Sequence, residues 1–139
     1  MSGRTPAESS EPRTVLIVDD DDALRRVLVA ALKKNGFQVI DADSAERGLQ
    51  LAESWRTPID VALLDIILPD SWGAQLVPGL RMTHPDIRVI FTSGHADTDP
   101  ILRAGIDAST EFLPKPFDGS ELIAVVERVL ASESRPHPG

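Results

Sequence analysis

Short apolar runs alternate with amphipathic stretches along most of this chain. Five of the runs are rich in β-branched and other apolar residues and therefore predict strands. The predicted strands are Thr14 to Val18, Phe37 to Ile40, the run that opens at Ile59, Ile87 to Thr92 and Glu111 to Leu113. The middle run, V-A-L-L-D-I-I-L-P, contains a single carboxylate, Asp65. Its pattern is typical of a strand buried on both faces of a parallel sheet.

The stretch after the first strand has the period of an amphipathic helix. Its apolar stripe consists of Leu24, Val27, Leu28, Ala31 and Leu32. These positions recur every three to four residues, as one helix face requires. Asp21 or Asp22 suits the N-cap, and Asn35-Gly36 suits the end of the helix.

The next two helices are predicted with less regular signals. A helix is expected from Ser44 to about Glu53, because Asp43 and Glu46 have the spacing of a capping box. A further helix, roughly Ala74 to Thr83, has a Pro-Gly pair in its interior and should be weak or kinked.

The last third of the chain is uneven. Asp97 to Ser109 contains proline and glycine and predicts only a short or irregular helix. Asp118 and Glu121 form a capping box, and a clean apolar stripe follows it as far as Leu130.

Five strands alternating with five helices predict an α/β fold. Right-handed crossovers give a doubly wound, five-stranded parallel sheet with helices on both faces, the flavodoxin-like arrangement. We expect one domain over residues 14–131. The polar segments 1–13 and 132–139 should be disordered tails.

Four of the five predicted strands end in polar residues that suit a site. They are Asp19-Asp20, Asp65, Thr92-Ser93 and Lys115. The second strand contributes nothing obvious. Ligands of open α/β sheets bind at the edge where the strands' carboxyl ends meet. Burial of an unaided carboxylate costs several kcal/mol, so Asp65 should meet partners at that edge.

Each candidate also has an ordinary structural explanation. Asp19 to Asp22 alone is typical of a solvated helix cap, and it lacks the alternating spacing of an EF-hand. Ser93 can cap a turn, His95 can be a surface loop residue, and Phe112 is by default a core residue. Taken together, however, adjacent carboxylates repel, and a set of oxygen ligands favours Mg²⁺ or Mn²⁺. Lys115, held between two prolines, would add a fixed positive charge.

Composition and charge exclude several classes of function. The 139 residues are 42% hydrophobic and 26% charged, which is typical of a globular domain. A net charge of −8 argues against direct nucleic-acid binding, and the absence of cysteine excludes thiolate chemistry. The sequence has no secretory signal and no apolar stretch long enough to span a membrane, so we expect a cytoplasmic protein without membrane contact.

Four short stretches of the sequence resemble the motifs of a known family. V-L-I-V-D-D-D, L-L-D-I-I-L-P-D-S-W-G, V-I-F-T-S-G-H and F-L-P-K-P-F occur in this order between Thr14 and Ala131. In these stretches the chain resembles the receiver domain of two-component response regulators. The resemblance implies that Asp65 accepts a phosphoryl group from a histidine kinase or a histidine phosphotransfer protein. It implies a metal site of Asp19, Asp20, Asp65 and the main-chain carbonyl of Ile67.

The resemblance assigns three more positions. Between the adjacent hydroxyl residues we favour Ser93, because it precedes a glycine and lies 22 positions before the lysine. The lysine is Lys115, and the Lys115-Pro116 bond is expected to be cis. Phe112 is the expected switch residue. Such a domain is a signalling phosphoprotein that catalyses only its own phosphorylation and dephosphorylation. It acts on a downstream protein that the sequence does not identify, as a monomer or as a weak dimer formed on activation.

The sequence departs from the family in three places, of which Asp22, in place of a proline common in receivers, has no expected consequence. Ile67 is apolar where some receivers have a polar side chain that positions the hydrolytic water, which predicts slow autodephosphorylation. The segment from Asp97 to Ser109 is poor in helix, as in receivers attached to hybrid histidine kinases, so the usual output face is an open question. Only nine residues follow Leu130, too few for an output domain. We expect either a single-domain regulator or a receiver taken from a longer chain, and the initial Met slightly favours the former.

Three alternatives remain at this stage. A pseudo-receiver would bind partners without taking a phosphoryl group. A flavodoxin-like cofactor binder would need a Ser-, Thr- and Gly-rich loop where Asp19 to Asp22 stand. An aspartyl phosphatase usually has a second Asp two residues after its nucleophile, and that position is Ile67.

Overall fold

The computed structural model describes residues 12–94 and 111–133. Its elements follow one another as the alternating pattern predicts. They are β1 (Thr14–Val18), α2 (Asp22–Lys34), β2 (Gln38–Ala42), α3 (Ala45–Ser54), β3 (Val61–Asp65), the 3₁₀ helix η1 (Gly73–Leu76), α4 (Val77–Thr83), β4 (Arg88–Ser93), β5 (Glu111–Pro114) and α6 (Gly119–Glu133). The irregular helix expected between Asp97 and Ser109, and His95, lie outside the described residues.

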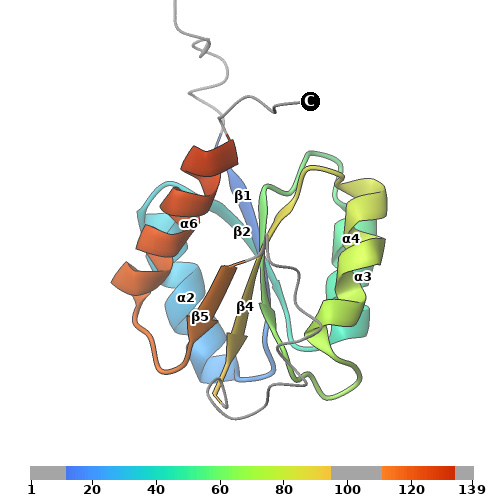
Figure 1. Ribbon diagram of the computed structural model, residues 1–139, viewed down its shortest axis with the longest axis horizontal. Helices are drawn as coiled ribbons and strands as arrows, with labels where there is room; N and C mark the ends of the chain where they lie inside the picture. The colour runs from blue at the N-terminus through green and yellow to red at the C-terminus, as the bar shows by residue number, and fades with distance from the viewer. Residues whose placement is uncertain (1–11, 95–110, 134–139) are drawn as a thin grey trace, which may run out of the picture.

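The five strands form one parallel sheet in the order β2-β1-β3-β4-β5. Helices α2 and α6 cover one face and α3 and α4 cover the other, so the predicted doubly wound fold is confirmed (Figure 1). All five residues of β1 and of β3 are buried. This explains why both strands are continuous apolar runs rather than alternating ones.

The core consists of one apolar cluster on each face of the sheet. Leu64 and Phe91 belong to the cluster beneath α3 and α4, and Leu63 and Ile90 belong to the cluster beneath α2 and α6. Successive strand residues therefore face opposite layers, and both layers exclude water from the middle of the sheet.

Helix ends follow local signals, with one correction. Asp21 is the N-cap of α2, and Gly36 ends that helix with a φ of 90°. Asp118 and Glu121 form the expected capping box at α6. For α3, however, the N-cap is Ser44, which accepts the N–H of Arg47, and the predicted role of Asp43 is wrong. Both residue types cap well, so the sequence alone did not separate them.

The helix expected from Ala74 to Thr83 is divided. A 3₁₀ helix covers Gly73–Leu76, and α4 begins at Val77 with Pro78 in its first turn. The proline therefore lies where its missing N–H has no intrahelical partner to lose, and it starts a helix instead of kinking one.

Contacts at the two ends of the described chain extend slightly past residues 14–131, the range expected for the domain. Arg13 is paired with Asp60 at 3.5 Å, and its carbonyl accepts the N–H of Gln38 at 2.8 Å. At the other end, α6 continues to Glu133. The remaining parts of the two expected tails, residues 1–11 and 134–139, lie outside the described residues. Over the described ranges, no helix combines the length and the apolarity needed to cross a bilayer.

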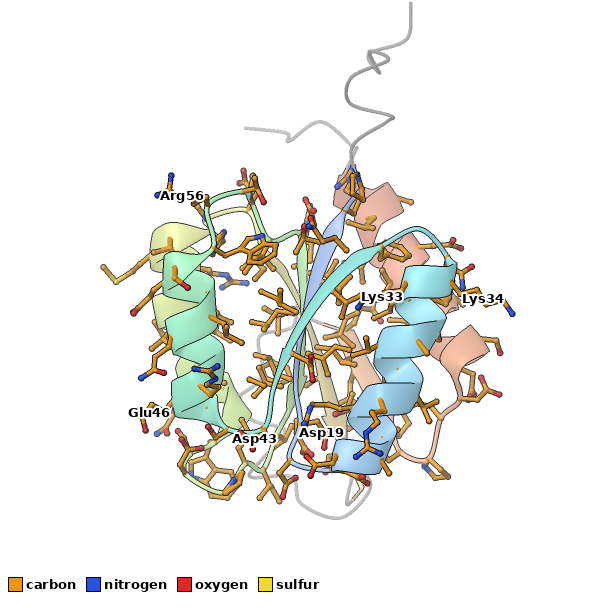
Figure 2. The ribbon with its side chains drawn as sticks, turned by 180° about the vertical axis from the view of Figure 1, so that it is seen from behind. Asp19, Lys33, Lys34, Asp43, Glu46 and Arg56 are labelled. Carbon is orange, nitrogen blue, oxygen red and sulfur yellow. The ribbon has the colours of Figure 1, made fainter. Side chains whose placement is uncertain are left out.

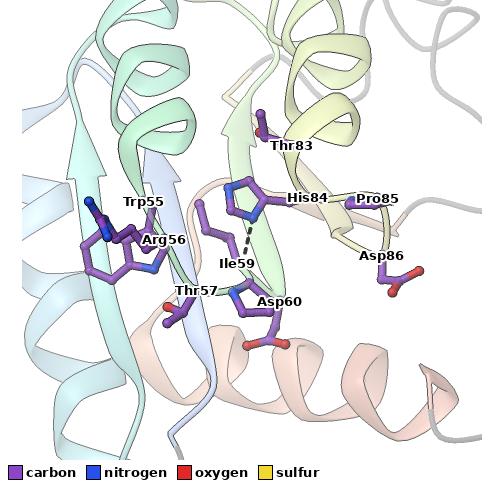
Figure 3. Close-up of a pocket in the computed structure, with 10 residues that line it drawn as sticks. Trp55, Arg56, Thr57, Ile59, Asp60, Thr83, His84, Pro85 and Asp86 are labelled. Carbon is purple, nitrogen blue, oxygen red and sulfur yellow. Dashed lines mark hydrogen bonds between the residues drawn. The ribbon is translucent and has the colours of Figure 1, made fainter.

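The amino-end edge of the sheet contains a hollow of about 360 Å³ between residues 55–60 and 83–86 (Figure 3). His84 is buried beside it and joins the end of α4 to α3 and to the loop that follows α3. Its Nδ1 accepts the N–H of Ile59 at 3.1 Å, so its Nε2 donates to the carbonyl of Ala52 at 2.8 Å. These bonds account for His84 as a structural residue.

Candidate phosphoacceptor and metal site

Three carboxylates gather at the carboxyl-end edge of the sheet. Asp19 and Asp20 follow β1, and Asp65 is the last residue of β3, the neighbouring strand. One oxygen from each of the three lies within 4.8 Å of the other two. Asp19 and Asp65 are buried, while Asp20 is exposed, so the cluster opens to solvent on one side. In Figure 2, Asp19 lies at this edge near the start of α2, whereas Lys33 and Lys34 lie at the other end of that helix.

Lys115, directly after β5, supplies the positive charge. Its Nζ lies 2.9 Å from Asp19 Oδ2 and 3.0 Å from Asp65 Oδ2. Its main-chain N–H donates to the carbonyl of Ser93 at 3.0 Å, and the Lys115–Pro116 peptide bond is cis. One ammonium against three carboxylates leaves a net charge of two negatives, which matches a divalent cation.

The close packing of charges changes the pKa values of Asp65 and Lys115. Burial raises the pKa of the Asp65 carboxyl above its ordinary value, the Lys115 ammonium opposes that rise, and the Asp19 carboxylate adds to it. Burial alone would lower the pKa of Lys115, but its hydrogen bonds to Asp19 and Asp65 outweigh burial and raise it. Lys115 is therefore a fixed cation at neutral pH.

The acidic turn after β1 is held by Arg25 of α2. Its guanidinium donates to the carbonyl of Asp19 at 2.8 Å and pairs with Asp22 and Asp41, each at 2.8 Å. The main chain of Asp19 also donates to the carbonyl of Ala42, the last residue of β2, at 3.1 Å. The second strand, from which the sequence predicted no contribution, thus helps to position Asp19.

The donor set fits a hard divalent cation. Three carboxylates with no His or Cys are ligands that favour Mg²⁺ or Mn²⁺ over Zn²⁺. The main chain of Ile67 also lies at the cluster, because its N–H donates to Asp65 Oδ1 at 3.1 Å. Its carbonyl oxygen, which the resemblance to receiver domains assigns as a further ligand, stays a prediction.

Of the other predicted site residues, Ser93 ends β4 and is 2% exposed. Thr92, the competing hydroxyl, is the ladder partner of Asp65 in the sheet and is also buried. Phe112 is half-buried in β5, in register with Phe91, and packs against the core cluster under α3 and α4. The roles of these residues stay predictions.

Sequence reasoning missed two residues of the loop after β3. Gly73 lies against the main chain of Asp65, where an added Cβ would be 2.1 Å from the Asp65 carbonyl oxygen. Asp70 accepts two N–H groups from the start of α3. The stretch L-P-D-S-W-G signalled a turn, but nothing local in the sequence signalled these distant contacts.

Comparison with known proteins agrees with this geometry. The family model for the response regulator receiver domain matches residues 15–127 of this sequence. The chain is 38% identical over 120 residues to sensor kinase CckA of Brucella abortus, covering 86% of this chain and 13% of that protein. It is 34% identical over 116 residues to the transcriptional regulatory protein CpxR of Escherichia coli K12, covering 84% of this chain and 48% of that protein. The chain thus spans less than half the length of these curated relatives.

Solved structures show the same similarity. A CheY-like response regulator receiver domain protein from Methanospirillum hungatei superposes with a TM-score of 0.79 at 26% identity, covering 88% of this chain and 97% of that one. The receiver domain of the hybrid histidine kinase CckA gives a TM-score of 0.72 at 31% identity, covering 84% and 98%. With this fold, this acidic cluster and a family model that covers most of its length, the chain belongs to the response regulator receiver domain family.

Proposed function

We propose that this chain is the phosphoacceptor of a two-component phosphorelay and that Asp65 takes the phosphoryl group. The donor is the phosphohistidine of a sensor histidine kinase or of a histidine phosphotransfer protein. The observation that carries the proposal is the cluster itself. Asp65 belongs to a half-open set of three carboxylates, and one ammonium lies 3.0 Å from its Oδ2. Similarity to the receiver domain of a hybrid histidine kinase supports a histidine kinase as the donor.

In this proposal Asp19, Asp20, Asp65 and the Ile67 carbonyl hold Mg²⁺, or Mn²⁺ in its place. The bound cation neutralises negative charge on the transferring phosphoryl oxygens. Lys115, already 3.0 Å from Asp65, supplies further positive charge, and the Ser93 hydroxyl donates a hydrogen bond to a phosphoryl oxygen. Positioning and neutralisation of charge are the main requirements of phosphoryl transfer.

The chemical step forms one bond and breaks another. An oxygen of the Asp65 carboxylate attacks phosphorus, and the bond from phosphorus to the donor's imidazole nitrogen breaks. The imidazole leaves with that electron pair and takes up a proton from solvent. The product is an acyl phosphate on Asp65. The chain thus catalyses only its own phosphorylation and, with water as the attacking group, its own dephosphorylation.

The signal then passes to a protein partner. The phosphoryl group draws Ser93 toward it, and Phe112, which is half-buried in β5, moves into the space that Ser93 leaves. This shifts a pre-existing equilibrium of the output face to which β5 and α6 contribute; the segment from Asp97 to Ser109, which the sequence predicts as the third part of that face, lies outside the described residues. The face contacts a downstream protein in the cytoplasm and not nucleic acid, with the chain acting as a monomer or as a weak dimer formed on activation.

The test is the intact mass of the protein after incubation with Mg²⁺ and phosphoramidate. The expected result is one added phosphoryl group on the wild type and none on Asp65→Asn, with no addition to the wild type when EDTA replaces Mg²⁺. An unmodified wild type that nevertheless binds Mg²⁺ would refute the proposal. It would instead favour a pseudo-receiver that works only through protein contact.

A further inference from the structure

The Asp70 carboxylate connects the loop after β3 to the start of α3. Its Oδ1 accepts the N–H of Ala45 at 2.9 Å, and its Oδ2 accepts the N–H of Glu46 at 3.0 Å. The third N–H of the helix, that of Arg47, is taken by the Ser44 hydroxyl at 3.2 Å. The first three N–H groups of α3 thus have acceptors on two residues. One is Ser44, the N-cap of the helix, and the other is Asp70, 25 positions from Ala45 along the chain.

The loop that carries Asp70 is a small hairpin, defined here as residues 66–73. Ile67 and Trp72 form an antiparallel bridge, and the N–H of Leu68 donates to the carbonyl of Ser71 at 3.0 Å. At its base, the N–H of Gly73 donates to the carbonyl of Ile66 at 2.7 Å. Asp70 therefore lies at the tip of a hairpin whose two sides are hydrogen-bonded from base to tip.

The same hairpin forms one wall of the acidic cluster. The N–H of Ile67 donates to Asp65 Oδ1 at 3.1 Å, and the Ile67 carbonyl is a candidate metal ligand. The start of α3, to which the tip is tied, directly follows β2. The carbonyl of Ala42 at the end of β2 accepts the N–H of Asp19 at 3.1 Å. These hydrogen bonds, together with the short main-chain segments from Ile67 to Asp70 and from Ala42 to Ala45, connect the Asp65 side of the cluster to the Asp19 side through Asp70.

We propose that Asp70 is a positioning residue, which ties the hairpin tip to α3 so that the Ile67 main chain stays aligned with the Asp65 carboxylate and its cation. The inference rests on the proposed function, because it assigns a purpose to the alignment. The N–H groups of Glu46 and Ala45 lower the pKa of Asp70, so this side chain is ionised throughout the neutral range. A carboxylate at a helix N-terminus is also favoured by the helix dipole.

A matched pair of variants separates positioning from stability. Asp70→Ala removes two hydrogen bonds to α3 and releases the hairpin tip. Ser44→Ala removes a hydrogen bond to the same helix end but leaves the hairpin untouched. Three quantities are measured on both variants: the urea midpoint, the Mg²⁺ dissociation constant by calorimetry, and the phosphorylation rate with phosphoramidate at saturating Mg²⁺. Amide hydrogen exchange at Leu68 and Gly73, in metal-free protein, reports on the hairpin directly.

The expected results differ between the two variants. Asp70→Ala should weaken Mg²⁺ binding roughly tenfold, as loss of a group that orients a metal ligand does. It should also slow phosphorylation and speed exchange at Leu68 and Gly73. Ser44→Ala should lower the urea midpoint while leaving Mg²⁺ binding and hairpin exchange as in the wild type. Asp70→Asn, which keeps one acceptor oxygen, should fall between wild type and Asp70→Ala, and it serves if the alanine variant does not fold.

Two contrary results are distinguishable. Equal Mg²⁺ affinity in wild type, Asp70→Asn and Asp70→Ala, in a wild type that is phosphorylated, would overturn the positioning role and leave the proposed function intact. A wild type that neither binds Mg²⁺ nor accepts a phosphoryl group would overturn both.

Discussion

Replacement of Gly73 by alanine is the sharpest structural perturbation of the site. The glycine begins the 3₁₀ helix η1, and its N–H donates to the carbonyl of Ile66 at 2.7 Å. An alanine Cβ would lie 2.1 Å from the carbonyl oxygen of Asp65 and 3.0 Å from its carbonyl carbon. Both atoms belong to the main chain of a buried strand, so neither can rotate away as a side chain would.

The cost follows from the overlap. An ordinary carbon-to-oxygen contact is about 3.3 Å or longer, so the hairpin must move by roughly 1.2 Å. Such overpacking costs about 1–3 kcal/mol, and loss of the Gly73 to Ile66 hydrogen bond adds about 1 kcal/mol, for a total of about 2–4 kcal/mol. With a slope of about 2 kcal/mol per molar urea, the midpoint should fall by about 1–2 M. Because Ile67 moves with the hairpin, Mg²⁺ affinity should fall as well.

Urea unfolding, followed by tryptophan fluorescence, and Mg²⁺ calorimetry measure the two effects. Gly36→Ala is the control. Gly36 has a φ of 90° but nothing within 4 Å of an added Cβ, and it lies near the other end of the sheet. This control should lose about 1–2 kcal/mol from backbone strain and keep the wild-type Mg²⁺ affinity. A Gly73→Ala protein with the stability and Mg²⁺ affinity of the wild type would refute the described contact between hairpin and strand.

Three further predictions concern stability and phosphoryl lifetime. His84→Leu leaves the buried N–H of Ile59 without its acceptor and should lower the free energy of unfolding by about 1–3 kcal/mol in urea titrations; an unchanged midpoint would contradict the described bond. The N–H of Glu121 lowers the pKa of Asp118 below its ordinary value of 3.8, so the stability that this carboxylate contributes should be complete above that value and lost as pH falls through the lower, folded-state pKa. Wild type should accordingly be more stable than Asp118→Asn at pH 7, with the gap closing in acid; a gap that does not depend on pH would show that charge is not involved. The Ile67 side chain is 43% exposed and apolar, and it cannot orient a hydrolytic water, so Ile67→Asn should shorten the lifetime of the phosphoryl group; an equal half-life in the two proteins would contradict this.

The parts of the fold that were predicted correctly have local causes. The buried run around Asp65 specified a strand because a continuous apolar run has few other places in an α/β domain. The pair Asp21 and Asp22 and the turn at Asn35-Gly36 indicated the ends of α2, since an N-cap and a left-handed turn each depend on one residue and its near neighbours; the structure selects Asp21 as the N-cap. The gathering of Asp19 and Asp65 at one edge followed from the parallel topology alone.

Most of the parts that were missed depend on distant partners. Asp70 is an unremarkable turn residue in the sequence, and only the folded chain brings α3 to its carboxylate. His84 has no motif around it, yet it bonds to Ile59 in the loop after α3, 25 residues away along the chain, and to Ala52 in α3, 32 residues away. The expected helix is divided at Val77 because Pro78 occupies the first turn of α4, and the periodicity did not show that this proline would start a helix and not interrupt one.

The most direct test of the central claim identifies which carboxylate is phosphorylated. Borohydride reduces an acyl phosphate to an alcohol, which converts the modified aspartate into homoserine. Tandem mass spectrometry of peptides from the phosphorylated and reduced wild type then distinguishes the three carboxylates that lie within 4.8 Å of one another. The account predicts homoserine at Asp65, with Asp19 and Asp20 unchanged. Homoserine at Asp19 or Asp20, or at none of the three, would contradict it.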